Sequence, residues 1–331
     1  MIKQRRRFPS SDKMFSLTFL LIVVVAAWWL LEPMPQLTAA DQPAPDGNAT
    51  IRAKAGSSDI VITTTSRLAG AIHSVTWGGK EFIDSHDHGR QLQSACSFDC
   101  GIAKGFWAEA YNPTEAGSRA DGAGKKSSSR LLSMSARGSQ LQSTTRMAFW
   151  LAPGEKSSGH PALNKQVLSE HLLTKRVRIG YKDWPHAIEY EVDFHVPKGE
   201  KHTYAQFEAL TGYMPEGFRH FWKYERSSGT LKPLDDGPGE QECPVVLATP
   251  NGQHAMGVYS PDQPSKGYEK AGYGRFRFRA QKVVKWNCVF RLRDAQGVPA
   301  GKHSFRVFVV VGNLEDVRAT LGGLCKAFGG S

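Results

Sequence analysis

The amino-acid sequence predicts an all-β fold: a large antiparallel β-sandwich with one C-terminal helix, preceded by an N-terminal apolar signal or anchor helix. Two observations support this prediction. Beyond residue 58, short segments rich in β-branched and aromatic residues recur, and turn-forming residues separate them. In the same region only residues 314–328 place apolar side chains at helical spacing. Many strands with a single helix favour antiparallel β architecture, and the Gly-rich signatures of nucleotide-binding folds do not occur.

Residues 1–40 are expected to be a signal peptide or a membrane anchor. A basic segment from Lys3 to Lys13 precedes an apolar run over residues 15–31, and small residues follow at 38–40. The run is long for a signal peptide and short for a membrane span, so both alternatives stay open. We therefore expect export to the periplasm, secretion, or anchoring to the outer face of the inner membrane. Membrane contact is expected only through residues 15–31.

Charge and cysteine usage limit the partners. Residues 1–40 carry five of the 42 Lys and Arg and two of the 31 Asp and Glu, which leaves 37 against 29, an excess of eight positive charges. This excess mildly favours an acidic partner such as an acidic polysaccharide, but it forms no stripe typical of nucleic-acid binding. Among five cysteines, Cys96 and Cys100 are close enough in sequence to form a disulfide in an oxidising compartment. No second close pair exists, so no zinc site is expected.

The elements follow from local composition. Residues 41–58 are rich in Pro, Ala, Gly and Asp and are expected to be a linker to a β-sandwich domain over residues 59–331. Residues 116–129 are expected to form a long, mobile loop. A tight turn is expected at Asn251-Gly252. Strands are expected over residues 60–65, 70–77, 81–83, 85–94, 131–136, 141–151, 167–179, 187–196, 204–210, 245–248, 255–259, 275–279, 283–293 and 305–311.

The segment Ser85–Ser94 is expected to be an unusually polar strand. Alternate side chains of a strand point to opposite faces. One face would carry His86, His88, Arg90 and Leu92, and the other Asp87, Gln91 and Gln93. Three interpretations stay open: a sugar site in which His acts as acid or base, a metal site completed by ligands such as His186 or His220, and a polar edge strand without a ligand.

Two aromatic segments offer further candidates. Trp107 and Tyr111, next to Asn112, could stack on a sugar ring, with Glu115 nearby as a carboxylic acid. The alternative is a loop that its aromatic side chains anchor to the core. The segment 213–224 contains five aromatic residues interleaved with basic ones, including His220 and Trp222, and fits either a carbohydrate platform or a lid packed on the core.

Two more polar residues lie near or within predicted strands. Glu242 precedes the strand 245–248 and could pair with Glu115, because glycosidases need two carboxyl groups. The alternative is an exposed loop charge. Asn287 lies in the apolar strand 283–293, where a buried amide needs a partner, so it is a modest site candidate.

The order of elements resembles that of galactose-mutarotase-like β-supersandwiches, the architecture of sugar epimerases and of parts of several polysaccharide lyases and glycoside hydrolases. The resemblance is carried by the succession of long antiparallel strands, by an early strand with His88 and Arg90, and by the late loop carboxylate Glu242. It covers most of residues 59–312 as architecture only. It implies a His and a Glu that act as acid and base at an anomeric centre, without identifying the His.

The main hypothesis is an exported carbohydrate-active protein that binds a glycan in a polar cleft and, if it is an enzyme, acts as a hydrolase, lyase or epimerase. The alternatives are a non-catalytic cell-surface module that binds glycan or protein, and an exported metal-binding protein. No cofactor, no metal ligand and no nucleic acid are expected under the main hypothesis. The catalytic candidates are His88, Glu115 and Glu242. The substrate-binding candidates are His86, Arg90, Gln91, Gln93, Trp107, Tyr111, Asn112, His220, Trp222 and Asn287.

Overall fold

The computed structural model describes residues 45–101, 106–263 and 268–329. The signal or anchor segment expected over residues 1–40, with its apolar run 15–31, lies outside these ranges. Among the residues described, no helix has the length and hydropathy that a membrane span requires.

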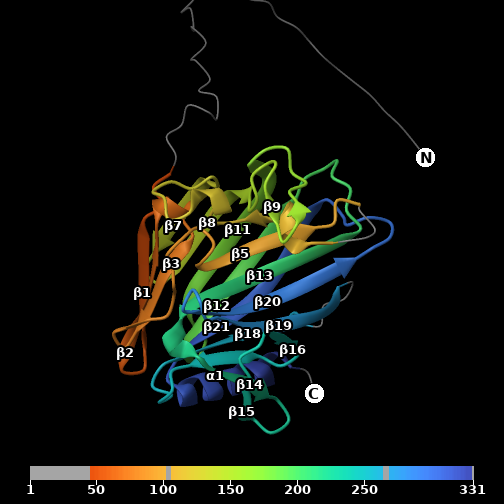
Figure 1. Ribbon diagram of the computed structural model, residues 1–331. Coiled ribbons are helices and arrows are strands. Elements are labelled where there is room, and N and C mark those ends of the chain that lie inside the picture. The colour runs from red at the N-terminus through yellow and green to blue at the C-terminus, as the bar shows by residue number, and fades with distance from the viewer. Residues whose placement is uncertain (1–44, 102–105, 264–267, 330–331) are drawn as a thin grey trace, which may run out of the picture. The chain divides into compact units, whose positions relative to one another are not determined.

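Nineteen strands of the described chain form one continuous antiparallel sheet that folds into two layers (Figure 1). The first layer contains, in spatial order, β1 (Ala49–Ala55), β2 (Ser58–Thr64), β3 (Ile72–Trp77), β5 (Leu92–Phe98), β13 (Tyr204–Pro215), β20 (Val283–Arg293), β19 (Glu269–Phe278) and β16 (Gly239–Gln241). The second contains β7 (Arg130–Arg137), β8 (Gln140–Phe149), β11 (Leu168–Tyr181), β12 (Trp184–Val196), β21 (Gly301–Gly312), β18 (Ala255–Tyr259), β17 (Val245–Ala248), β14 (His220–Glu225) and β15 (Thr230–Leu234).

Two short strands complete this sheet or connect its layers. The strand β6 (Pro113–Thr114) pairs with both β5 and β8 and so joins the layers, and β4 (Lys80–Glu81) pairs with β3. A separate small hairpin consists of β9 (Lys156–Ser157) and β10 (His160–Pro161). The expected antiparallel β-sandwich is therefore confirmed for the described residues.

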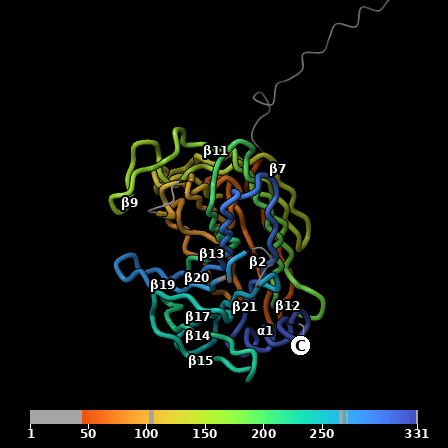
Figure 2. The backbone as a smooth tube through the Cα atoms, turned by 90° about the vertical axis from the view of Figure 1, so that its right-hand side faces the viewer, coloured from red at the N-terminus to blue at the C-terminus, as the bar shows by residue number. Residues whose placement is uncertain are grey.

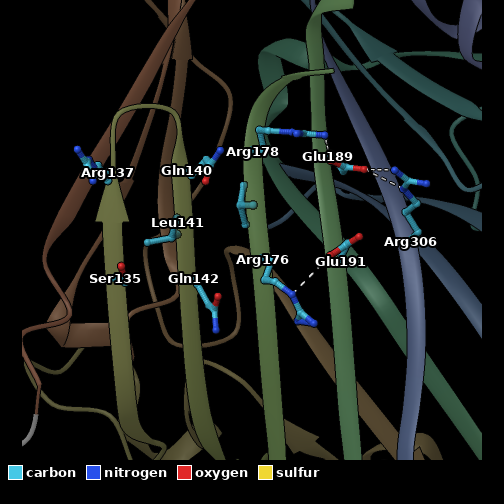
Figure 3. A pocket seen from close by; sticks show the side chains of 11 residues that line it. Ser135, Arg137, Gln140, Leu141, Gln142, Arg176, Arg178, Glu189, Glu191 and Arg306 are labelled. Atoms are coloured by element: carbon cyan, nitrogen blue, oxygen red, sulfur yellow. Dashed lines mark hydrogen bonds and ion pairs between the residues drawn. The ribbon is translucent and has the colours of Figure 1, made fainter. Parts of the chain in front are cut away.

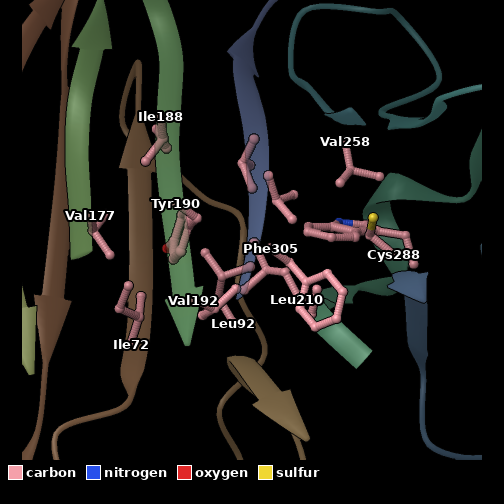
Figure 4. Packing of buried hydrophobic residues seen from close by; sticks show 14 of the residues in the cluster. Ile72, Leu92, Val177, Ile188, Tyr190, Val192, Leu210, Val258, Cys288 and Phe305 are labelled. Carbon is pink, nitrogen blue, oxygen red and sulfur yellow. The ribbon is translucent and has the colours of Figure 1, made fainter. Parts of the chain in front are cut away.

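The core lies between the two layers, because every second side chain of each long strand points there. In β11 and β12, Val177, Ile188 and Tyr190 face Ile72 and Leu92 of the first layer (Figure 4). Each such aliphatic side chain stabilises the fold by roughly 1.5–3 kcal/mol when it is fully buried. The intervening residues of the same strands are thereby directed to the outer faces, where polar side chains can remain in contact with water.

The helix α1 (Leu314–Phe328) has the bounds that the sequence predicted. Asn313 caps its first turn by accepting hydrogen bonds from the backbone of Glu315 (3.0 Å) and Asp316 (2.8 Å). Its apolar side chains pack on the outer face of the second layer. The helix lies against β12, β18 and β21, and Figure 2 shows its backbone beside this layer. The contacting set contains Val317, Leu321 and Leu324 of the helix and Val246, Phe308 and Val310 of the strands.

Two expected segments differ in the structure, and one possible disulfide is not formed. The strand expected over Ser85–Ser94 begins only at Leu92, because residues 85–91 form turns in which Asp84 and Asp87 accept backbone hydrogen bonds. The linker expected over residues 41–58 already contains β1 and the start of β2. Cys96 and Cys100 are both free thiols.

The loop over residues 116–129 is organised around one carboxylate. The side chain of Asp121 accepts hydrogen bonds from the backbone amides of Ser118 and Ser128, each at 2.8 Å. The imidazole of His88 lies between this loop and Arg67. Its Nδ1 is 2.7 Å from the carbonyl oxygen of Gly122, and its Nε2 is 2.9 Å from that of Arg67. The segment expected to be a long, mobile loop therefore has specific polar anchors in the structure.

One end of the core contains a buried histidine without a hydrogen-bond partner among the described residues. Neither ring nitrogen of His171 makes a hydrogen bond there, although Nε2 lies 3.3 Å from Oε2 of Glu200. His202 contacts the same oxygen at 2.8 Å. Burial lowers the pKa of His171 to about 4, the charge of Glu200 opposes this shift, and His202 and His195 add to it. Below its unfolded-state pKa, His171 therefore opposes folding.

We expect the protein to lose up to about 3 kcal/mol of stability between pH 6.5 and pH 4 through His171, because the unfolded chain binds a proton there that the folded chain does not. Urea unfolding across this range measures the loss. The variant His171→Phe should flatten the pH dependence, whereas His86→Gln, at an exposed position, should not. An unchanged slope in His171→Phe would contradict this assignment.

Candidate functional site

A β-bulge in β13 shapes the outer face of the first layer. Glu208 pairs with Val289 of β20, and Thr211 pairs with Asn287, so the register slips by one residue between them. Val289 and Asn287 are two residues apart and share a face, which places Glu208 and Thr211 on that same face although they are three apart. The hydroxyl of Ser94 donates to the carbonyl of Ala209 at 2.7 Å and so satisfies a backbone group of the bulge.

The bulge places a carboxylate between two hydrogen-bond donors of β20. Oε1 of Glu208 accepts from Nδ2 of Asn287 at 2.9 Å and lies 3.4 Å from Nζ of Lys285. The side chains of Glu208 and Lys285 are 19% and 12% exposed. Burial alone lowers the pKa of Lys285, but the charge of Glu208 and the Tyr213 hydroxyl together raise it. The three side chains form a fixed, charged group that still reaches the surface.

Glycines of β19 leave room for this group. Oδ1 of Asn287 accepts from the backbone amide of Gly274 at 3.0 Å. A Cβ at Gly274 would lie 2.3 Å from that oxygen, and a Cβ at Gly272 would collide with the carboxylate of Glu240. The two glycines therefore let polar side chains lie flat across β19, which larger residues would prevent.

An aromatic shelf borders the charged group. Nζ of Lys285 lies 5.0 Å from the ring centroid of Tyr213 and 5.4 Å from that of Phe276. Phe278 continues the shelf, with its ring 6.4 Å from Tyr213 and 6.2 Å from Phe276. At 38% exposure, Phe278 is one of two large apolar side chains exposed among the described residues. An exposed ring next to fixed polar groups is a common arrangement for binding an amphipathic ligand.

A second carboxylate lies on the same face. Glu240 accepts from both terminal nitrogens of Arg291 at 2.7 Å and 2.6 Å, in a bidentate ion pair. Its side chain lies over Gly272 of β19, and Glu208 belongs to β13, two strands away across β20. Strands two positions apart are separated by roughly 9.5 Å. We call Glu208, Glu240, Lys285, Asn287 and Arg291, with the shelf Tyr213, Phe276 and Phe278, the outer polar face.

Four of the predicted binding residues lie on or beside the outer polar face. Asn287 belongs to it, and Gln93 lies in the same row across β5 and β13, because both residues pair with Thr211. The carbonyl of Gln91 accepts from the backbone amide of Tyr213 at 3.1 Å, and Oε1 of its buried side chain has no partner among the described residues. Asn112 donates to the hydroxyl of Ser97 at 3.0 Å, at the far end of β5.

His86, His88 and Arg90 do not share a face, because their segment is a turn. His86 is exposed, and His88 is buried with both ring nitrogens next to carbonyl oxygens, at 2.7 Å and 2.9 Å. Arg90 pairs with Asp87 at 3.0 Å. His88 therefore connects the loop over residues 116–129 to the segment that contains Arg67.

Glu115 lies inside the sandwich and away from the outer polar face. One of its oxygens contacts Nζ of Lys175, and the other accepts from the backbone amide of Ser94 at 3.1 Å. Both charged side chains are buried. Their neighbour Tyr190 has a hydroxyl with no hydrogen-bond partner among the described residues, and burial, then the charge of Glu115, raises its pKa.

The remaining candidates are dispersed. Trp107 stacks on His160 with a centroid distance of 4.8 Å, and the hydroxyl of Tyr111 donates to Glu200 at 3.0 Å. On β14, His220 is exposed, and Trp222 packs against the apolar cluster under α1. Glu242 is exposed after β16.

No group of three or more His, Cys, Asp or Glu suited to a metal ion occurs within the described ranges. The outer polar face was only partly foreseeable. Asn287 was predicted, and Tyr213 belongs to the aromatic segment 213–224 that was considered as a carbohydrate platform. Glu208, Lys285, Phe276 and Phe278 were not predicted. A single carboxylate inside the apolar run 204–210 was a usable signal for Glu208, but the bulge that directs its side chain outward leaves no pattern in the sequence.

We expect Glu115→Ala to destabilise the fold by about 3–5 kcal/mol, because it leaves the buried Lys175 charge without its partner. The double variant Glu115→Leu/Lys175→Met removes both charges and should recover most of that loss. Urea unfolding of the two variants and the unmodified protein measures the difference. Full stability of Glu115→Ala would contradict the buried ion pair.

No family model matches the chain, and neither does any curated protein. Comparison with solved structures finds a glycosyl hydrolase family 38 protein from Enterococcus faecalis, at 11% identity and a TM-score of 0.48, covering 85% of this chain and 32% of that one. An α-galactosidase from Lactobacillus brevis aligns at 8% identity and 0.44, covering 86% and 42%. A provisionally assigned aldose 1-epimerase from Klebsiella pneumoniae aligns at 8% and 0.38, covering 86% and 92%. The chain thus spans less than half of the first two proteins, and the likeness is one of architecture.

Proposed function

We propose that the protein binds a carbohydrate on the outer polar face of the first layer. The observation that carries this proposal is the carboxylate of Glu208, held between Asn287 and Lys285 beside an exposed aromatic shelf. Fixed acceptors and donors suit the hydroxyl groups of a sugar, and an aromatic ring suits the C–H face of the sugar ring.

Each residue of the outer polar face would make a different contact with the sugar. Glu208 accepts from a sugar hydroxyl with the oxygen that Asn287 leaves free, and Lys285 donates to a neighbouring one. Phe278 provides the exposed ring. Because Asn287 and Lys285 hold the carboxylate before a ligand arrives, little side-chain entropy is lost on binding.

Catalysis is a second candidate function, and the two carboxylates on one face favour it. Glu208 belongs to β13, and the side chain of Glu240 reaches from β16 over Gly272 of β19, two strand positions from β13. That spacing of roughly 9.5 Å lies at the upper end of the range that inverting glycosidases use for acid and base. Each carboxylate is already paired with a cation, Lys285 and Arg291 respectively, and would have to give up part of that ion pair to act on a substrate. Binding without turnover therefore remains the primary proposal.

Export is part of the proposal and rests on the sequence of residues 1–40. A basic segment followed by the apolar run 15–31 is typical of proteins that cross or enter the inner membrane. The ligand would then be an extracellular or envelope glycan.

Binding can be tested with the purified chain on an array of neutral and acidic glycans, followed by calorimetry with the best ligand. We expect Glu208→Gln and Phe278→Ala each to weaken binding at least tenfold, because each removes one of the two kinds of contact. Leu132→Ala is the matched control, since Leu132 is the other exposed large apolar side chain and lies on β7. Unchanged affinity in both site variants would refute the proposed site.

Turnover is tested separately with the glycans that bind. Reducing ends, unsaturated products and exchange at the anomeric carbon are followed over time. If the site is catalytic, Glu208→Gln and Glu240→Gln should each lower the rate at least about 100-fold, in the range expected for loss of an acid or base. The control Glu269→Gln removes a paired carboxylate of β19 near the end of the strand. Product formation that is equal in all four proteins would exclude this pair.

A further inference from the structure

The outer face of the second layer has its own hollow, on the opposite side of the sandwich from the outer polar face. It measures about 490 Å³ and lies over β7, β8, β11, β12 and β21 (Figure 3). The helix α1 covers another part of this layer, around Val246, Phe308 and Val310. The hollow is therefore the part of this face that α1 leaves open.

Positive charge exceeds negative charge in the hollow. Four arginines and two glutamates line it, which leaves an excess of two positive charges. Arg178 and Arg306 approach Glu189 from either side and share its carboxylate, at 2.6 Å for Arg178 Nη2 and 2.8 Å for Arg306 Nε (Figure 3). The Glu189 carboxylate thus forms ion pairs with two guanidinium groups. Arg137 has no ion-pair partner within the described ranges.

The cross-strand register brings these residues into two rows. In the first row, Gln140 pairs with both Arg137 and Arg178, and Arg178 pairs with Glu189. The second row consists, strand by strand, of Ser135, Gln142, Arg176, Glu191 and Arg306. Arginines therefore alternate with amide, hydroxyl and carboxylate groups across five strands.

The guanidinium of Arg306 is held in place before any ligand arrives. It lies 5.2 Å from the ring centroid of Tyr181 and 5.4 Å from that of Phe308. A third ring, of Phe328 in α1, lies 5.2 Å from it. These cation–π contacts fix the side chain at the edge of the hollow, so little entropy is lost when it binds an oxyanion.

The hollow continues into a second one of about 630 Å³, and the two share Arg176, Glu191 and Arg306. The second hollow adds Lys302 and Ser304 on β21, and it also contains two carboxylates, Asp193 and Asp262, and two aromatic residues, Tyr268 and Phe305. The excess of positive charge therefore lies in the first hollow. A surface of this extent suits a chain-like ligand that lies across several strands. A small anion would occupy only one end of it.

We propose that this surface binds an acidic polysaccharide, with Arg137, Arg178 and Arg306 contacting its oxyanion groups. Guanidinium groups match carboxylate and sulfate oxygens in bidentate geometry. The amide and hydroxyl groups of Gln140, Gln142 and Ser135 contact the sugar hydroxyls between the charged groups. This second surface is separate from the outer polar face and does not depend on the function proposed there.

The composition of the hollow favours a polysaccharide over a nucleic acid. No aromatic side chain lines the hollow of Figure 3, where Arg137, Arg178 and Arg306 lie, so a base has no platform to stack on beside these arginines. Glu189 and Glu191 oppose double-stranded DNA, with about one charge per 1.7 Å of its axis, more strongly than a polysaccharide with one carboxylate on each sugar. A ligand with charged groups separated by neutral hydroxyls fits the alternating rows better.

The test measures binding of the purified full-length chain to polygalacturonate, dextran sulfate, neutral dextran and double-stranded DNA. We expect binding to polygalacturonate or dextran sulfate that weakens as salt is raised, with no binding to neutral dextran. The arm that binds identifies carboxylate or sulfate as the recognised group. The double variant Arg137→Gln/Arg178→Gln should weaken this binding at least tenfold.

The control is Arg279→Gln/Arg293→Gln, which removes the same charge from exposed arginines of the first layer. It should leave binding within about twofold, since the Debye length is about 10 Å at 0.1 M salt. Equal losses in the two double variants would show a net-charge effect and overturn the proposal. Absence of binding to both acidic polysaccharides would also overturn it, as would tighter binding to DNA with the same arginine dependence. Glu208→Gln should bind normally here, so this test and that of the outer polar face fail independently.

Discussion

The burial of alternate side chains between two sheet layers is the constraint on which the rest of this structure depends. Each long strand gives every second residue to one shared apolar core, as Val177 and Ile188 do in the second layer. The remaining residues must then lie on an outer face. Because the two layers share one core, their outer faces point away from each other. The molecule therefore has two independent polar surfaces, with Glu208 on one and Arg178 on the other.

Polar groups inside the core are the exceptions to this rule, and each is accounted for differently. Lys175 and Glu115 neutralise each other between the layers. His171 remains neutral because burial lowers its pKa to about 4. Both features cost stability compared with apolar side chains of the same volume, since charges and imidazoles lose water on burial. They make the interior of this sandwich sensitive to single substitutions and to acid.

The outer polar face depends on a local departure from strand regularity. A regular β13 would have directed Glu208 and Thr211 to opposite faces. The bulge between them keeps both on the outside, and Ser94 hydrogen-bonds the bulge. Gly274 then allows Asn287 to lie across β19 and reach Glu208. The hollow of the second layer has a different origin, because it is regular strand pairing that aligns its arginines with amides and glutamates.

The sequence alone determined the class of fold and the position of α1. Strand and helix periodicity are local properties. They can be recognised in residues 167–179, 187–196 and 314–328 without knowing which elements pack against these segments. It also identified Asn287, as an amide that an apolar strand could not leave unpaired. It did not reveal that the polar segment before Leu92 is a turn, because the aspartates that hold it act through backbone amides.

Only the tertiary structure decided which side chains meet. Glu115 and Lys175 are sixty positions apart, and Glu208 and Asn287 are seventy-nine apart. Whether a carboxylate lies in the core or on a surface depends on which strands become neighbours and in which register. A one-residue shift in the register of β13 would move a side chain such as that of Glu208 from the surface to the core. Pairing between distant strands is a property of the whole chain. The sequence could therefore suggest candidate residues for a site, but only the fold shows which of them lie together.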